Sequence, residues 1–169
     1  MGKIFPEAYD DLLQFIPEEE RNDLLTAYYT RVMNPDPAIH MAAARAFMRF
    51  DIICSTHAPN KAKVEEELKN DNYILSVARA FLHYSYNKLF LEPNQLLSRL
   101  ERVTHLPAIL VQGRWDAICL PDMAYTLHRK WDNSTLWIAP FGGHSANDPA
   151  IATALATAAD SFVTRSRSN

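Results

Sequence analysis

Two residues with complementary acid–base chemistry each follow an apolar run in the second half of the chain. Asp116 comes shortly after residues 109–111 (Ile-Leu-Val), and His144 comes shortly after residues 136–139 (Leu-Trp-Ile-Ala). A carboxylate that accepts one ring N–H of a histidine fixes its tautomer and stabilises its cation, so that the other ring nitrogen can take a proton from a serine hydroxyl. We therefore predict that Asp116 and His144 are the acid and the base of a hydrolytic site.

The nucleophile that such a pair would serve is not evident. An acid followed by a histidine is the chain order of the α/β-hydrolases, in which a serine on a Gly-x-Ser-x-Gly turn comes earlier still. The four glycines stand at positions 2, 113, 142 and 143, and none belongs to such a turn. Ser145 directly follows His144, and adjacent side chains rarely point to a common centre. Cys119 is expected to be a packed small residue rather than a reactive thiol.

The region after Thr104 has the pattern strand, helix, strand, helix. Its two apolar runs do not alternate with polar residues, which is typical of strands covered on both faces in a parallel sheet. The sequence predicts helices over residues 123–131 and 149–163, and Asn147 or Asp148 is expected to cap the second helix. The tail at residues 165–169 is expected to fray. In open α/β sheets the functional crevice lies beyond the carboxyl ends of the strands, where both predicted catalytic residues fall.

Glycines 142 and 143 precede His144 directly. Because glycine readily adopts a positive φ, we expect this pair to turn the backbone tightly and to bring the imidazole into the crevice.

Up to about Leu100 nearly every periodic segment is helical, and Asp36 with Pro37 has the pattern of a helix start. We predict an all-helical cap domain over residues 1–103 and part of an α/β core over 104–169. The helical segments lie around residues 12–16, 17–33, 37–50, 61–68, 73–86 and 93–100. Two parallel strands do not make a stable sheet, so the fold class is a partial α/β fold that lacks its leading strands.

Composition excludes several classes of function. A net charge of −3 gives no reason to expect nucleic acid or an anionic membrane as a partner. The start of the chain lacks the apolar stretch of a signal peptide, and no run is long enough to span a membrane, so a cytoplasmic setting is expected. Neither the two cysteines nor the six histidines have metal-ligand spacing, and no cofactor is expected.

Several segments of the chain match a known family. In the predicted core they are residues 90–97, 109–116 with Cys119 and Pro121, 124–131 and 143–145, and in the helical cap they are residues 5–9, 36–38 and 42–47. Through these segments the chain resembles the carboxyl-terminal half of proline iminopeptidases, and the resemblance covers nearly the whole sequence.

The resemblance implies an α/β-hydrolase fold and a serine peptidase that removes amino-terminal proline from peptides, with Asp116 and His144 in its catalytic triad. In that family the serine elbow and the oxyanion hole precede the cap. Two acidic cap residues of the family bind the free amine of the substrate, and they align here with Asp51 and Phe81. Asp51 keeps a carboxylate on a shorter arm, whereas Phe81 cannot pair with a cation through a charge.

Two further hypotheses accompany the hydrolase prediction. The first predicts that these 169 residues alone are inactive, because they lack the serine and the oxyanion donors. A competing hypothesis is a non-catalytic module that binds a protein or peptide and retains hydrolase motifs. In either case the missing amino-terminal half, or another chain, is expected to complete the sheet.

Overall fold

The computed structural model describes the backbone of residues 1–167 and the side chains of residues 1–163, in two compact units. The helical unit comprises Met1–Cys54 and Pro59–Pro93. The sheet unit comprises Ser55–Ala58 and the chain from Asn94 onward. These units differ from the predicted domains in residues 55–58 and 94–103.

The helical unit contains the predicted amphipathic helices. They are α1 (Pro6–Gln14), α2 (Leu24–Val32), α3 (Pro37–Cys54), α4 (Lys61–Glu67) and α5 (Asp71–Tyr86), with 3₁₀ turns η1 (Glu18–Asp23) and η2 (Lys88–Phe90). Helix α1 begins and ends earlier than the segment expected around residues 12–16, and α3 extends to Cys54. The segment that starts at Pro17 forms η1 before α2 begins. Asp23 separates the two, since its side chain accepts a hydrogen bond from Thr26 N and so caps α2.

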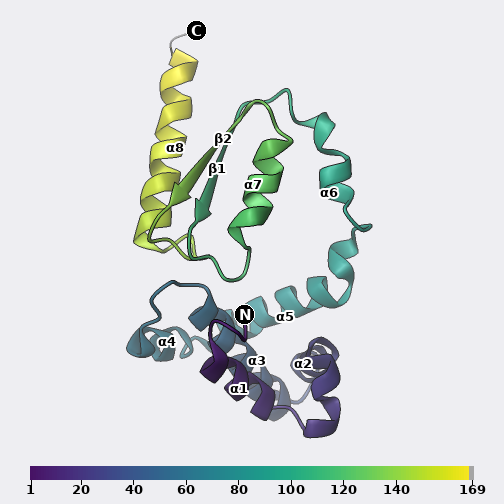
Figure 1. The fold of residues 1–169 in the computed structure, drawn as a ribbon. Helices are drawn as coiled ribbons and strands as arrows, with labels where there is room; N and C mark the ends of the chain where they lie inside the picture. The colour runs from purple at the N-terminus through teal and green to yellow at the C-terminus, as the bar shows by residue number, and fades with distance from the viewer. Residues whose placement is uncertain (168–169) are drawn as a thin grey trace. The chain divides into compact units, whose positions relative to one another are not determined.

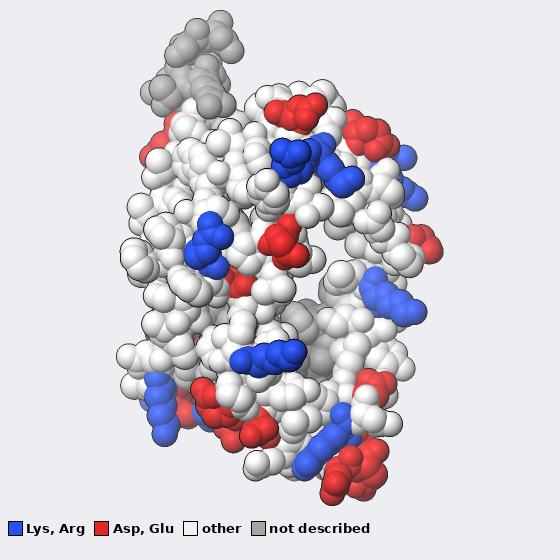
Figure 2. Space-filling model, viewed as in Figure 1, with Lys and Arg blue, Asp and Glu red and all other residues white. Residues whose placement is uncertain are grey.

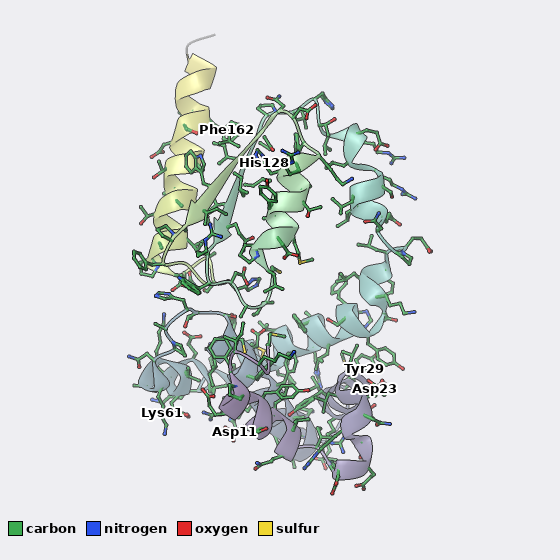
Figure 3. All side chains as sticks on the ribbon, viewed as in Figure 1. Asp11, Asp23, Tyr29, Lys61, His128 and Phe162 are labelled. Atoms are coloured by element: carbon green, nitrogen blue, oxygen red, sulfur yellow. The ribbon has the colours of Figure 1, made fainter. Side chains whose placement is uncertain are left out.

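The core of the helical unit lies among α2, α3 and α5, which pack against one another in pairs. Tyr28, Ile74 and Leu82 are fully buried there. The hydroxyl of Tyr28 donates to Leu12 O at 2.7 Å, so burial leaves no polar atom of that ring without a partner. Tyr29 of α2, labelled in Figure 3, stacks on Tyr86 of α5 with ring centroids 4.2 Å apart.

The predicted start of α3 is confirmed. Asp36 Oδ1 accepts a hydrogen bond from Ala38 N at 2.9 Å, and Pro37 is the first residue of the helix. Asparagine side chains cap α4 and α5 in the same way, at Asn60 and Asn70. These local hydrogen bonds satisfy amides that have no partner within their own helix.

A left-handed turn ends the helical unit. Lys88, Leu89 and Phe90 have φ of 52°, 58° and 56°, and none of them is a glycine. In this region the Cβ of an L-residue crowds the following carbonyl oxygen, at a cost of about 1–2 kcal/mol per residue. The turn therefore stores strain in three consecutive exposed residues.

Replacing Lys88 with glycine is expected to raise the free energy of unfolding by about 1 kcal/mol, because glycine adopts a positive φ without that clash. Urea unfolding followed by circular dichroism measures the change. Lys130→Gly is the matched control, since Lys130 already has a φ of −105° and has no such strain to lose. A Lys88→Gly variant that is no more stable than the wild type contradicts the assignment of strain.

The sheet unit has the predicted order of strand, helix, strand and helix. It contains β1 (Ala108–Gly113), α7 (Pro121–Arg129), β2 (Ser134–Ala139) and α8 (Pro149–Arg167), preceded by α6 (Gln95–Ser98) and the 3₁₀ turn η3 (Leu100–Arg102). The strands are parallel, and Figure 1 shows α7 and α8 on either side of them.

Two predicted elements in this unit have different bounds in the structure. The helix expected over 93–100 is broken into two short turns, and Asn94 before them has a φ of 60°. Helix α8 continues to Arg167, which includes part of the tail expected to fray, and residues 168–169 lie outside the described part of the chain. Helix α8 begins at Pro149 as predicted, directly after Asp148, whose side chain accepts a hydrogen bond from Gly143 N.

The strands are less buried than their sequences indicate. Ile109, Leu110 and Val111 are each only partly buried, although the apolar run predicts cover on both faces. The physical reason is the size of the sheet: within residues 1–167 it has two strands, so each strand is hydrogen-bonded along one edge only. An unpaired parallel strand leaves its outer N–H and C=O groups open to another strand.

Charged side chains of both signs are interspersed over the face seen in Figure 2. The described part of the chain contains exposed ion pairs, such as Arg45 with Asp71 at 2.5 Å and Lys69 with Glu66 at 2.6 Å. Exposed pairs of this kind contribute little to stability. None of the helices in the described part of the chain has the length and apolar character needed to cross a membrane.

Candidate active site

The sheet brings Asp116 and His144 together. Gly113 and Ala139 are paired at the carboxyl ends of β1 and β2, and each predicted catalytic residue follows its strand by a few residues. Parallel strands end at the same edge of a sheet, so both loops emerge side by side. As a result, His144 Nδ1 lies 3.0 Å from Asp116 Oδ2, which is hydrogen-bond distance.

Asp116 is buried, with 7% of its surface exposed, and both of its oxygens accept hydrogen bonds. Oδ1 accepts from Ile118 N at 2.9 Å and from Cys119 N at 2.8 Å. Oδ2 accepts from Gln112 Nε2 at 3.3 Å and faces His144 Nδ1. A carboxylate has acceptor sites for all of these donors, so the side chain is fixed in one orientation toward the imidazole.

Gln112 is a site residue that sequence reasoning missed. It is buried at the end of β1, and its amide nitrogen also lies 3.0 Å from Cys119 O. Gln112 thus links the carboxylate of Asp116 to the loop that follows it. The sequence feature that could have revealed Gln112 is a polar residue at the end of a continuous apolar strand. Such a residue needs hydrogen-bond partners when it is buried.

The other ring nitrogen of His144 is Nε2. Since Nδ1 faces Asp116, Nε2 is the ring atom available to a reacting group, and the side chain is 39% exposed. In the neutral tautomer with hydrogen on Nδ1, Nε2 is a proton acceptor. This arrangement is that of a general base oriented by a carboxylate.

The prediction that Gly142 and Gly143 use a positive φ is wrong, because no glycine of this chain has one. Glycine is required at both positions because a Cβ at either one would come too close to neighbouring atoms. A Cβ on Gly142 would lie 2.5 Å from Ile151 Cδ1, and a Cβ on Gly143 would lie 2.8 Å from His57 N. The pair lets the loop before His144 pass closely between α8 and the segment that contains His57.

Ser145 and Cys119 have surroundings that weaken them as nucleophiles. Ser145 Oγ accepts a hydrogen bond from Asn147 N at 3.2 Å. Cys119 is exposed rather than packed as predicted, yet partial burial of its sulfur and the negative charge of Asp116 raise the pKa of the thiol. A raised pKa lowers the fraction of reactive thiolate at neutral pH.

The third predicted site residue, Asp51, lies on α3 of the helical unit and is partly buried. Phe81, which aligns with the second acidic position, is on α5 and is 47% exposed. Its ring centroid lies 5.3 Å from that of Phe47, one turn before Asp51 on α3. Both phenylalanines line a mainly apolar cavity of about 360 Å³ in the helical unit, with Tyr9 and Phe50.

A second histidine of the sheet unit has a structural partner. His128 on α7, labelled in Figure 3, has Nδ1 2.8 Å from the hydroxyl of Ser134. Among the residues that the structure describes, no group of three or more histidine, cysteine, aspartate or glutamate side chains is arranged to hold a metal ion.

The chain is similar to several known proteins. No protein-family model matches the chain. It is 35% identical over 161 residues to a probable proline iminopeptidase of Leptolyngbya boryana, and 36% identical over 161 residues to a proline iminopeptidase of Xylella fastidiosa. A proline iminopeptidase of Arabidopsis thaliana is 35% identical over 157 residues. These matches cover 95%, 95% and 92% of this chain, and 50%, 51% and 41% of the relatives.

The parallel strand pair, its two helices and the acid–histidine pair define a partial α/β-hydrolase fold, from its carboxyl-terminal region, preceded by helices. More particularly, the chain is similar to the carboxyl-terminal half of proline iminopeptidases, which confirms the predicted resemblance. The chain spans about half the length of the curated relatives it matches.

Proposed function

We propose that this chain is the carboxyl-terminal part of a proline iminopeptidase-like serine hydrolase, which releases amino-terminal proline from peptides. The observation that carries the proposal is the 3.0 Å contact between His144 Nδ1 and Asp116 Oδ2 at the ends of two parallel strands. The similarity to proline iminopeptidases supports the choice of reaction. A cytoplasmic location belongs to the same proposal, since both cysteines are free thiols.

In the proposed mechanism His144 acts as base and then as acid. Asp116 accepts the Nδ1–H of the neutral ring, so Nε2 takes the proton of a serine hydroxyl as its oxygen attacks the scissile carbonyl carbon. The imidazolium then gives that proton to the leaving amine as the acyl bond to it breaks. Water attacks the acyl-enzyme in the same way, which releases proline and restores the serine. The serine and the oxyanion donors come from the amino-terminal half of the fold.

The free edges of the two strands favour a partner that completes the sheet. Each strand of the sheet unit is hydrogen-bonded along one edge, and its apolar residues are partly buried. A polypeptide that adds parallel strands would pair with the free strand edges and would cover the partly buried apolar residues. We propose that the amino-terminal half of the hydrolase is this partner, and that the 169 residues alone do not turn over substrate.

A chimera tests this proposal. It joins the amino-terminal half of the Leptolyngbya boryana relative to this chain, and its hydrolysis of proline β-naphthylamide is compared with that of the 169-residue chain alone. We expect turnover by the chimera and background rates for the chain. Turnover by the chain alone that is lost in His144→Ala would contradict the need for a second half.

The proposal assigns Asp51 to the amine of the substrate. In the chimera Asp51→Asn is expected to raise KM for proline β-naphthylamide about tenfold with a smaller change in kcat, because an ion pair to the substrate ammonium is lost. Asp10→Asn, which changes an exposed aspartate of α1, is the matched control. An unchanged KM in Asp51→Asn would remove this residue from the binding site.

The alternative is a non-catalytic module that binds a peptide through its apolar surface. The cavity lined by Phe47 and Phe81, which contains mainly apolar side chains, favours it. A chimera that folds with a cooperative unfolding transition and hydrolyses no aminoacyl naphthylamide, while the 169-residue chain binds apolar peptides, would favour this second function.

A further inference from the structure

The loop that carries His144 is held by two acceptors outside it. Asp148 Oδ2 accepts a hydrogen bond from Gly143 N at 2.7 Å. Ser55 O accepts from both His144 N and Ser145 N, each at 2.8 Å. The backbone on both sides of the His144 Cα is therefore tied to groups from other parts of the sheet unit.

These two acceptors both crowd the position that a side chain on residue 143 would occupy. A Cβ on Gly143 would lie 2.8 Å from Ser55 O and 2.9 Å from Asp148 Oδ2, both closer than real Cβ contacts. The loop is thus held by hydrogen bonds at three consecutive amides, with no space for a side chain at Gly143. A shift of about 1 Å would lengthen the contact between His144 Nδ1 and Asp116 beyond hydrogen-bond distance.

Asp148 is 8% exposed, so its carboxylate needs partners within the protein. The imidazole of His57 lies nearby, but its Nδ1 is 3.7 Å from Oδ2, too far for a hydrogen bond. The carboxylate of Asp148 consequently acts mainly as the acceptor of the short hydrogen bond from Gly143 N. A charged acceptor makes such a bond shorter and stronger than a neutral one does.

We propose that Asp148 is a positioning residue for His144, which acts through the N–H of Gly143. The inference rests on the proposed role of His144 as general base. By holding Gly143 against the Ser55 segment, Asp148 keeps Nδ1 of the ring on the carboxylate of Asp116 and so keeps the lone pair of Nε2 toward a substrate. Loss of this acceptor lowers kcat, and KM changes little.

Asp148 also stands directly before Pro149, the first residue of α8, where a negative charge stabilises a helix. Three variants separate that role from positioning. Asp148→Asn removes the charge and keeps an oxygen that can accept from Gly143 N. Asp148→Ser keeps a residue that is favoured at a helix start but withdraws the acceptor from Gly143, and Asp148→Ala removes both. Asp132→Ala, in an exposed turn, is the control.

The first measurement uses the 169-residue chain and NMR. In Asp148→Ser and Asp148→Ala, amide hydrogen exchange at Gly143 should rise about tenfold or more, and ¹⁵N shifts of the His144 ring should show loss of the Nδ1–H tautomer. Asp148→Asn and Asp132→Ala should keep the wild-type tautomer and exchange within about threefold. If Asp148→Ala does not fold, the contrast between the serine and asparagine variants carries the comparison.

Two results would overturn the proposal. One is a wild-type His144 tautomer in Asp148→Ser. The other is loss of that tautomer in both Asp148→Ser and Asp148→Asn, which would assign the effect to the negative charge at the helix start. A second measurement, kcat and KM of the chimera, should show a loss of about tenfold in kcat for Asp148→Ser. An inactive wild-type chimera would count against the proposed function, while the NMR comparison would still decide the role of Asp148.

Discussion

His144→Ala in the chimera is expected to lower kcat for proline β-naphthylamide on the order of 10⁴-fold or more, with a far smaller change in KM. The loss is large because the serine hydroxyl then has no base to take its proton, and the leaving amine has no acid to protonate it. The substrate still binds, since the imidazole acts in the transition state more than in the ground state. Steady-state kinetics over a range of substrate concentrations measure both constants.

His128→Ala is the matched control for this prediction. His128 is also in the sheet unit, but its Nδ1 faces the hydroxyl of Ser134, which leaves it without a link to Asp116. We expect its kcat to stay within about threefold of the wild type, as for a change outside the reacting groups. Equal losses in the two histidine variants would show that the assay follows folding and not the proposed base.

Gly113→Ala is expected to destabilise the sheet unit by about 3 kcal/mol or more. A Cβ at this position would overlap Gly143 O and would lie 2.6 Å from Gly142 O. Both obstacles are backbone atoms of the loop that carries His144, so no flexible side chain can move aside. Either the unit unfolds more easily, or the loop moves outward and His144 leaves Asp116.

Chemical denaturation and the ring ¹⁵N shifts of His144 distinguish those outcomes for the 169-residue chain. Gly2→Ala is the control, because its Cβ would meet mainly the side chain of Tyr9, at 2.8 Å, and an aromatic ring near the start of the chain can turn away. Wild-type stability together with a wild-type His144 tautomer in Gly113→Ala would contradict the close approach of the two loops.

The pairing of Asp116 with His144 could be predicted because both of its causes are local in sequence. Each residue follows an apolar run, and parallel strands end at one edge of a sheet. The helix start at Asp36 was predictable for the same reason, since its hydrogen bond reaches only two residues along the chain. Periodicity and capping residues therefore predicted most of the helices and both strands.

The supports of the site could not be predicted, because they depend on contacts between distant segments. Ser55 contributes a backbone carbonyl, which every residue possesses and no motif reveals. Asp148 has the sequence pattern of a helix cap, and its partner Gly143 becomes evident only when the loop is folded. The partial burial of Ile109 and its neighbours was also missed, since a sequence shows what a strand prefers and not how many neighbours it has.

The four residues 55–58 belong to the sheet unit although helices of the other unit flank them in sequence. On the ribosome, Ser55 therefore emerges well before His144 and Ser145, whose amides donate to its carbonyl oxygen. The loop that carries His144 can reach its native form only after residues 143–148 have been synthesised. Nascent chains arrested before residue 144 should accordingly contain folded helices of the helical unit while the proposed site is still unformed.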